Sequence, residues 1–193
     1  MSADRPLGQT PSQTVGPFFA FALTPVEAGH SWSAVANATM ADDTTPGQRI
    51  VIEGRVLDGQ GAPITDALIE LWQADAAGRT VARAGANATF TGFGRSGTGM
   101  LDGGLYRFTT IKPGAAAGGA PHIDVILQMR GLLTHLFTRL YFDDEAAANA
   151  RDAALTHVPA ERRHTLIART HAPGRYVFDI HMQGDDETVF FDL

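Results

Sequence analysis

The chain has 193 residues, of which 44% are hydrophobic, and it carries a formal net charge of −6 and no cysteine. This length suits a single domain with its own core, so we expect one domain over residues 1–193. The absence of cysteine excludes disulfides and cysteine-ligated zinc, and the negative charge argues against a nucleic-acid surface. No apolar run approaches the roughly 20 residues of a membrane span, and no apolar leader opens the sequence. We therefore expect a cytoplasmic protein without a membrane segment.

The first part of the chain, residues 1–48, predicts an arm and a connecting segment. Residues 1–24 are rich in Pro, Gly, Gln and Thr and show neither a helical nor a strand period. Phe18 and the phenylalanines beside it are too apolar for a free tail, so we expect this arm to pack against a surface. A short helix is expected around residues 32–40, ending before a Pro-Gly turn.

From residue 49 onward, in the expected core over residues 49–193, short strands alternate with Gly/Pro turns. The expected strands cover residues 50–57, 67–73, 105–111, 123–129, 136–142, 165–169, 176–182 and 189–193. Residues 84–104 contain seven glycines and predict a long loop. Residues 143–154 predict one helix with an acidic first turn. The pattern predicts an all-β fold, namely a β-sandwich with an N-terminal arm and one or two short helices.

Several short motifs, taken in chain order, resemble one known family. Residues 10–18 read Thr-Pro-Ser-Gln-Thr-Val-Gly-Pro-Phe, and residues 70–75 read Glu-Leu-Trp-Gln-Ala-Asp. Lys-Pro-Gly at residues 112–114 ends one expected strand, and His122-Ile-Asp124 opens the next. Together with residues 139–144 and 187–193, these segments resemble the intradiol ring-cleavage dioxygenases. The resemblance implies that family's β-sandwich.

In that family, two tyrosines and two histidines hold a ferric ion. The resemblance maps these four ligands onto Thr80, Ala116, His122 and Asp124. A hard trivalent ion prefers phenolate oxygens, and none of the three tyrosines in this chain matches a ligand position. We therefore expect no iron site within this chain. The resemblance implies the α, metal-free subunit of a heteromeric member, with Fe(III) bound by the partner β subunit.

The resemblance also implies that this chain completes its partner's substrate pocket. The matching positions are Thr14, Gly16, Pro17 and Arg130. A guanidinium can orient a substrate carboxylate through charge-assisted hydrogen bonds, and a Gly-Pro turn lets backbone approach a ring closely. The implied reaction is O2-dependent intradiol cleavage of protocatechuate to 3-carboxy-cis,cis-muconate. The implied assembly is a hetero-oligomer of α–β pairs.

Two other interpretations stay open from the residues alone. The chain could be a structural or binding β-sandwich that takes no part in any active site. Alternatively, His122, Asp124 and the distant His181 could form the 2-His-1-carboxylate triad of a ferrous oxygenase. Against both the ferric and the ferrous interpretation, a His-x-Asp pair can simply be hydrogen-bonded to neighbouring groups. By itself, Arg130 is typical of a solvated arginine at a strand end.

Overall fold

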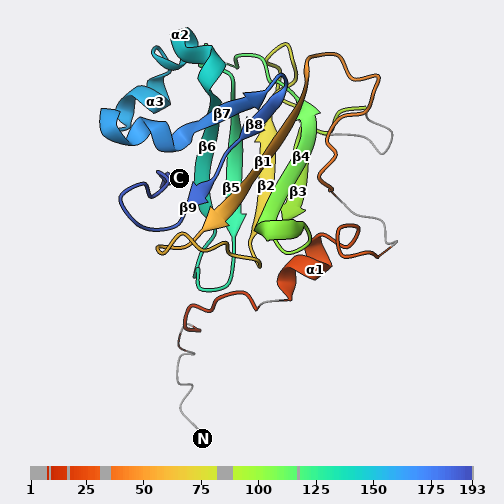
Figure 1. The fold of residues 1–193 in the computed structure, drawn as a ribbon, viewed down its shortest axis with the longest axis vertical. Coiled ribbons are helices and arrows are strands. Elements are labelled where there is room, and N and C mark those ends of the chain that lie inside the picture. Colours follow the sequence, from red (N-terminus) through yellow and green to blue (C-terminus); the bar gives the residue numbers. More distant parts are fainter. Residues whose placement is uncertain are drawn as a thin grey trace, which may run out of the picture.

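The protein is described by a computed structural model that covers residues 8, 10–16, 18–30, 36–81, 89–116 and 118–192. Within these ranges the fold consists mostly of strands, with a few short helices (Figure 1). The strands are β1 (Arg49–Leu57), β2 (Leu68–Gln73), β3 (Phe93–Gly97), β4 (Leu105–Ile111), β5 (His122–Gln128), β6 (Leu136–Phe142), β7 (Ile167–Ala172), β8 (Arg175–Val177) and β9 (Ile180–His181). This architecture confirms the all-β prediction.

Pairing connects the strands in the order β3-β2-β5-β6-β7-β8-β1-β4, and β9 pairs with β1. β5 lies antiparallel between β2 and β6. On the other side, β1 pairs antiparallel with β4 and parallel with β8. β7 joins the two groups, because it pairs with β6 on one edge and with β8 on the other.

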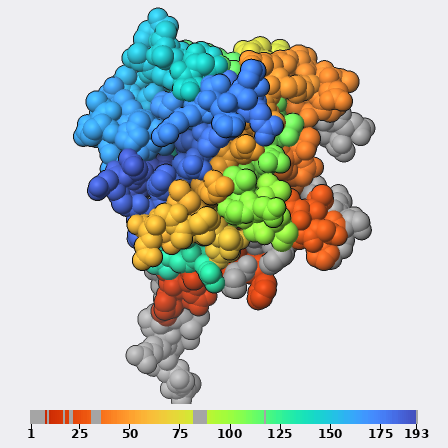
Figure 2. All heavy atoms as spheres, in the orientation of Figure 1, coloured from red at the N-terminus to blue at the C-terminus, as the bar shows by residue number. Residues whose placement is uncertain are grey.

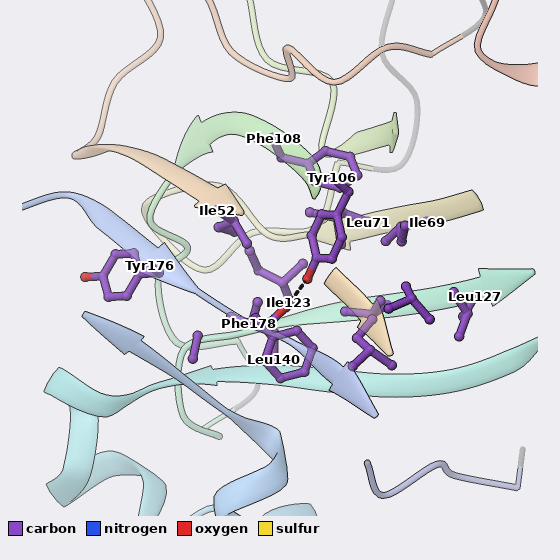
Figure 3. Close-up of a cluster of buried hydrophobic side chains, with 14 of the residues drawn as sticks. Ile52, Ile69, Leu71, Tyr106, Phe108, Ile123, Leu127, Leu140, Tyr176 and Phe178 are labelled. Atoms are coloured by element: carbon purple, nitrogen blue, oxygen red, sulfur yellow. Dashed lines mark hydrogen bonds between the residues drawn. The ribbon is translucent and has the colours of Figure 1, made fainter. Parts of the chain in front are cut away.

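The core forms between these two groups of strands because their side chains alternate. Every second residue of β1 and β5 is buried, as expected when a strand turns one face inward. Figure 3 shows residues such as Ile52, Ile123 and Leu140 meeting in this core. There the buried Tyr106 hydroxyl donates a hydrogen bond to the Phe178 carbonyl. Tyrosine is therefore accommodated in an apolar core because its single donor finds a backbone acceptor.

The expected loop over residues 84–104 was wrong in its described part. It contains β3 and a 3-10 helix over Asp102–Gly104. Glycines lower strand propensity, which hid β3 in the sequence, but β2 offers it a complete pairing edge. Gly94 serves packing, because a Cβ there would lie 2.5 Å from the Met40 side chain.

The single helix expected over residues 143–154 is also wrong, because the chain breaks it. Its parts are the 3-10 helix Asp143–Glu145, α2 (Ala146–Asn149) and α3 (Ala153–His157). Asp152 interrupts the run in an extended conformation, and its side chain accepts a hydrogen bond from the Leu155 N–H. An aspartate that caps the next helix in this way ends the preceding one.

In the arm, residues 10–16 have no regular structure, but α1 (Phe19–Leu23) is a helix that the sequence pattern did not predict. The helix expected over residues 32–40 is absent from its described part, residues 36–40, where Thr39 forms a bridge to Thr109. The remaining residues of that expected helix lie outside the described ranges.

The last expected strands are shorter than the sequence indicates. The 176–182 strand is divided between β8 and β9, near the point where the Asp179 carboxylate accepts a hydrogen bond from the Arg55 N–H at 2.8 Å. In place of the 189–193 strand, Phe191 forms one isolated bridge to Phe137. No helix in the described ranges is long and apolar enough to cross a membrane.

Candidate functional site

The structure brings together all four residues that the sequence maps onto metal ligands. Thr80, Ala116, His122 and Asp124 line one pocket of about 150 Å³, here called the ligand-equivalent pocket. His122 and Asp124 are two residues apart on β5, so their side chains leave the same face of the sheet. Thr80 and Ala116 come from two loops that the fold places against this face.

These two loops contact each other directly through their backbones. The Gly114 N–H donates to the Asp75 carbonyl at 2.9 Å. Gly78 has a φ of +78°, and a Cβ on it would lie 2.0 Å from the Ala115 carbonyl oxygen. Only glycine fits such a position without strain. Backbone contacts between these two loops therefore hold the Thr80 and Ala116 sides of the pocket together.

The two ligand-type side chains in this pocket already have protein partners. His122 Nδ1 is 2.8 Å from the Ala120 carbonyl, which fixes the ring so that Nε2 faces Asp124. Nε2 and the Asp124 Oδ1 atom are 3.9 Å apart. The same Oδ1 accepts a hydrogen bond of 2.8 Å from the Arg139 Nε. Asp124 is thus engaged in an ion pair with a cationic side chain.

Arg139 and Tyr141 extend this contact into a larger polar network. Burial by itself would lower the pKa of Arg139, but hydrogen bonding to Tyr141 and the Asp124 charge raise it overall. The Tyr141 hydroxyl donates to the buried Asp152 carboxylate at 3.0 Å. Burial raises the pKa of Tyr141 to about 12. Asp152 also accepts a hydrogen bond of 2.9 Å from the Ala120 N–H.

The donor set does not fit a ferric ion. All three tyrosines use their hydroxyl groups as hydrogen-bond donors: Tyr106 to the Phe178 carbonyl, Tyr141 to Asp152 and Tyr176 to Asp144. Burial is the leading cause that raises the pKa of each one. Each phenol is therefore held in its neutral form, whereas a ferric ion prefers phenolate.

The interpretation of His122, Asp124 and His181 as a ferrous triad is wrong. His181 lies on β9 and lines a different pocket, of about 300 Å³, together with His164 and Asp186. In the described part of the chain, no group of three or more His, Asp or Glu side chains is placed to hold a metal ion. His122 and Asp124 therefore have no third ligand of this kind.

The residues expected to serve the partner's pocket form a second cluster, here called the arm site. Thr14 lies in the arm, and its Oγ1 accepts a hydrogen bond of 2.7 Å from the Gly131 N–H. Arg130, the preceding residue, has a side chain that is 64% exposed. Figure 2 shows the arm, in red, beside the teal connection between β5 and β6. Gly16 is exposed, and Pro17 lies outside the described residues.

Arg130 is oriented by an acidic neighbour. Its Nε lies 2.8 Å from Oδ2 of Asp66, whose side chain is 13% exposed, although the contact lacks hydrogen-bond geometry. The guanidinium has further N–H groups on its two terminal nitrogens. It can therefore keep this ion pair and still present donors to a carboxylate in solution or on a substrate.

The arm site and the ligand-equivalent pocket lie at opposite ends of β5. His122 opens the strand, and Gly131 follows its last residue, Gln128, by three positions. Seven residues at about 3.3 Å each separate the two places by roughly 20 Å. In Figure 1 the arm lies at the lower end of β5 and α2 lies at the upper end. None of the described arm-site residues, Thr14, Gly16 and Arg130, lines the ligand-equivalent pocket.

Sequence reasoning missed Arg139, Tyr141 and Asp152. A usable signal was present in β6, where Arg139 and Tyr141 alternate like His122 and Asp124 on β5. In the register, Arg139 stands opposite Asp124 and Tyr141 stands opposite His122. Asp152 had no such signal, because it reaches the network from a loop between helices.

Comparisons with known proteins show which proteins the chain is similar to. A family model described as "Dioxygenase" matches residues 24–184. The chain is 51% identical to the protocatechuate 3,4-dioxygenase alpha chain of Burkholderia cepacia, over 97% of this chain and 98% of that one. It is 39% identical to the beta chain from that organism, over 74% of this chain and 67% of that one. The dioxygenase domain of a carbohydrate-binding fusion protein from Streptomyces sp. SirexAA-E superimposes with a TM-score of 0.59 at 27% identity, covering 80% and 89% of the two chains.

Proposed function

Because the chain belongs to the intradiol ring-cleavage dioxygenase family, we propose that it acts as the α subunit of a protocatechuate 3,4-dioxygenase. Its partner is a β subunit, and the two assemble as α–β pairs in a hetero-oligomer. The complex cleaves protocatechuate with O2 to 3-carboxy-cis,cis-muconate. The ferric ion that this family uses is bound by the β subunit. The absence of cysteine from the chain suits a location in the reducing cytoplasm.

The separation of the two sites along β5 is the observation that carries this proposal. The ligand-equivalent pocket does not fit a ferric ion, and the arm site lies roughly 20 Å away, at the far end of β5. The arm site therefore cannot complete a reaction centre in its own chain. A partner of the same fold, such as a β chain with its own set of ligands, gives the arm site a pocket to serve.

Within the complex, the arm site binds and orients the substrate. Arg130 attracts the ring carboxylate of protocatechuate, and its ion pair with the largely buried Asp66 limits how far the guanidinium can turn. The Thr14 hydroxyl accepts its hydrogen bond from Gly131, so its own proton stays available to donate to a substrate oxygen or a water molecule. Gly16 has no heavy atom within 4 Å of where a Cβ would stand, so backbone can approach a ring there.

Co-expression tests the proposal. We expect this chain to purify alone without protocatechuate-cleaving activity, and to give an iron-containing, active complex when produced with a β chain. The measurements are iron content, the tyrosinate-to-iron absorption band and oxygen uptake with protocatechuate. Iron-dependent cleavage by the isolated chain would overturn the division of labour. Failure to associate with any β chain would favour a separate structural or binding role.

A further inference from the structure

We infer that the His122–Asp124 pair of the ligand-equivalent pocket is metal-independent because the Arg139 guanidinium, and not a metal cation, is the positive partner of Asp124. The inference concerns residues of this chain alone and does not depend on the substrate or on the partner. It starts from the mismatch between the donor set and a ferric ion. The pocket holds two ligand-type side chains, and the cation paired with one of them, Asp124, is Arg139, which lines the adjoining pocket of about 360 Å³.

Strand register places this arginine beside the ligand-equivalent residues. Trp72 on β2, Asp124 on β5 and Arg139 on β6 are direct neighbours in one row across the sheet. Arg139 therefore reaches Asp124 as a cross-strand pair, with Nε and Oδ1 2.8 Å apart. An arginine and a carboxylate placed opposite each other in this way stabilise the pairing of the two strands.

Further contacts connect His122 to the neighbouring strand and to the loop before α3. Arg139 donates to Asp124, and Tyr141 follows two positions along β6, opposite His122. Tyr141 continues to Asp152, and Asp152 continues to the Ala120 N–H. The Ala120 carbonyl then fixes His122, whose ring centroid is 5.6 Å from that of Tyr141. His122 and Asp124 are thus each engaged by a protein group, through His122 Nδ1 and through Asp124 Oδ1.

The spacing of His122 and Asp124 would let a cation bind between them, and Arg139 opposes this. Their Nε2 and Oδ1 atoms are 3.9 Å apart, and a divalent ion with bonds of about 2.0–2.2 Å to each could bridge them. With Nδ1 held by a backbone carbonyl, Nε2 has the orientation of a metal-binding nitrogen. Arg139 already uses the Asp124 oxygen, and its positive charge repels a second cation at this distance. Removing the guanidinium should therefore uncover a weak cation site.

The test compares Arg139→Gln with Arg107→Gln. The second variant is a matched control, because Arg107 forms a cross-strand pair with Glu53 on the opposite group of strands. Zinc ion is the probe, measured by isothermal titration calorimetry with the full chain. We expect Arg139→Gln to bind Zn²⁺ at least about tenfold more tightly than the wild type. We expect Arg107→Gln to bind it no better than the wild type.

Two further measurements locate the effect and keep the inference falsifiable. Adding Asp124→Asn to Arg139→Gln should abolish the gained Zn²⁺ affinity, and a chelator should leave the wild-type Tm unchanged. Equal Zn²⁺ binding by Arg139→Gln and the wild type would overturn the inference, provided that circular dichroism shows the variant to be folded. If the variant does not fold, a wild-type Tm that falls with chelator would overturn it, and an unchanged wild-type Tm would support it.

Discussion

The Thr14 hydroxyl and the Gly131 N–H form a hydrogen bond of 2.7 Å between residues that are 117 positions apart in sequence. This contact attaches the arm to the turn after β5, next to Arg130. It places the arm site at the end of β5 opposite the ligand-equivalent pocket.

Replacing Arg130 with Gln should weaken substrate binding by the α–β complex. A charge-assisted hydrogen bond is worth about 1.5–3 kcal/mol, so KM for protocatechuate should rise about tenfold or more while the iron content stays the same. Steady-state kinetics of the co-expressed complex measure this. Arg107→Gln is the control, because Arg107 is about half exposed and pairs with Glu53 on β1. An unchanged KM would place Arg130 outside the substrate pocket.

Replacing Asp152 with Asn should destabilise the fold by about 1–3 kcal/mol. Asp152 is 3% exposed and accepts hydrogen bonds from Tyr141 and from the Ala120 and Leu155 N–H groups. The side chain of asparagine has one acceptor oxygen where aspartate has two, and its NH2 group cannot accept a hydrogen bond. Fewer of the three donors that face this position would therefore find an acceptor. Urea unfolding measures the loss, and the exposed Asp185→Asn should change stability by less than about 0.5 kcal/mol.

The same aspartate should contribute to acid sensitivity. Burial by itself would raise the pKa of Asp152, but hydrogen bonds from Leu155, Ala120 and Tyr141 lower it overall. A folded-state pKa below the unfolded value adds stability above about pH 4, and this stability is lost as the pH falls further. Between pH 5 and pH 3, the wild type should therefore lose more unfolding free energy than Asp152→Asn. Parallel pH profiles would contradict this assignment.

Gly78→Ala should destabilise the protein more than Gly118→Ala. Both glycines have a φ of +78°, so both substitutions carry the same backbone strain. A Cβ at position 78 would also lie 2.0 Å from the Ala115 carbonyl, whereas nothing lies within 4 Å of a Cβ at position 118. The difference between the two unfolding free energies isolates this loop contact. Equal losses would show that the loops can separate without cost.

Tyr106→Phe should lower stability at neutral pH by about 1–2 kcal/mol, because the buried Phe178 carbonyl loses its donor. Tyr176→Phe should cost less, because the Asp144 carboxylate that accepts from Tyr176 keeps its ion pair with Lys112. Chemical unfolding of both variants gives the comparison.

Tyr106 should also make the fold sensitive to alkali. Burial raises the pKa of Tyr106 well above its usual value. Its contribution to stability is complete below the unfolded pKa of about 10 and declines as the pH rises above that value. Tyr106→Phe should therefore lose less stability than the wild type between pH 10 and pH 11. A steeper loss in the variant would contradict the assignment.

Much of the sheet could be predicted because its signals are local. Strand-like runs of residues bounded by turn signals predicted β4 and β6 with correct ends, and they placed the ends of β1, β2 and β5 within one residue. β3 was missed because its glycines carry no apolar period, and the helix over residues 143–154 was wrong because Asp152 caps α3. In both cases a partner distant in sequence or a capping side chain outweighed local propensity.

The sequence by itself determined the family resemblance, the all-β class and the absence of phenolates from the ligand positions, because these depend on residue identity and short-range periodicity. The tertiary structure alone decided that Arg139 stands beside Asp124 and that Thr14 lies beside Arg130. It also decided that these two contacts lie at opposite ends of β5. Strand register and chain reversal bring together residues that no sequence spacing relates, so their chemistry becomes visible only in the folded chain.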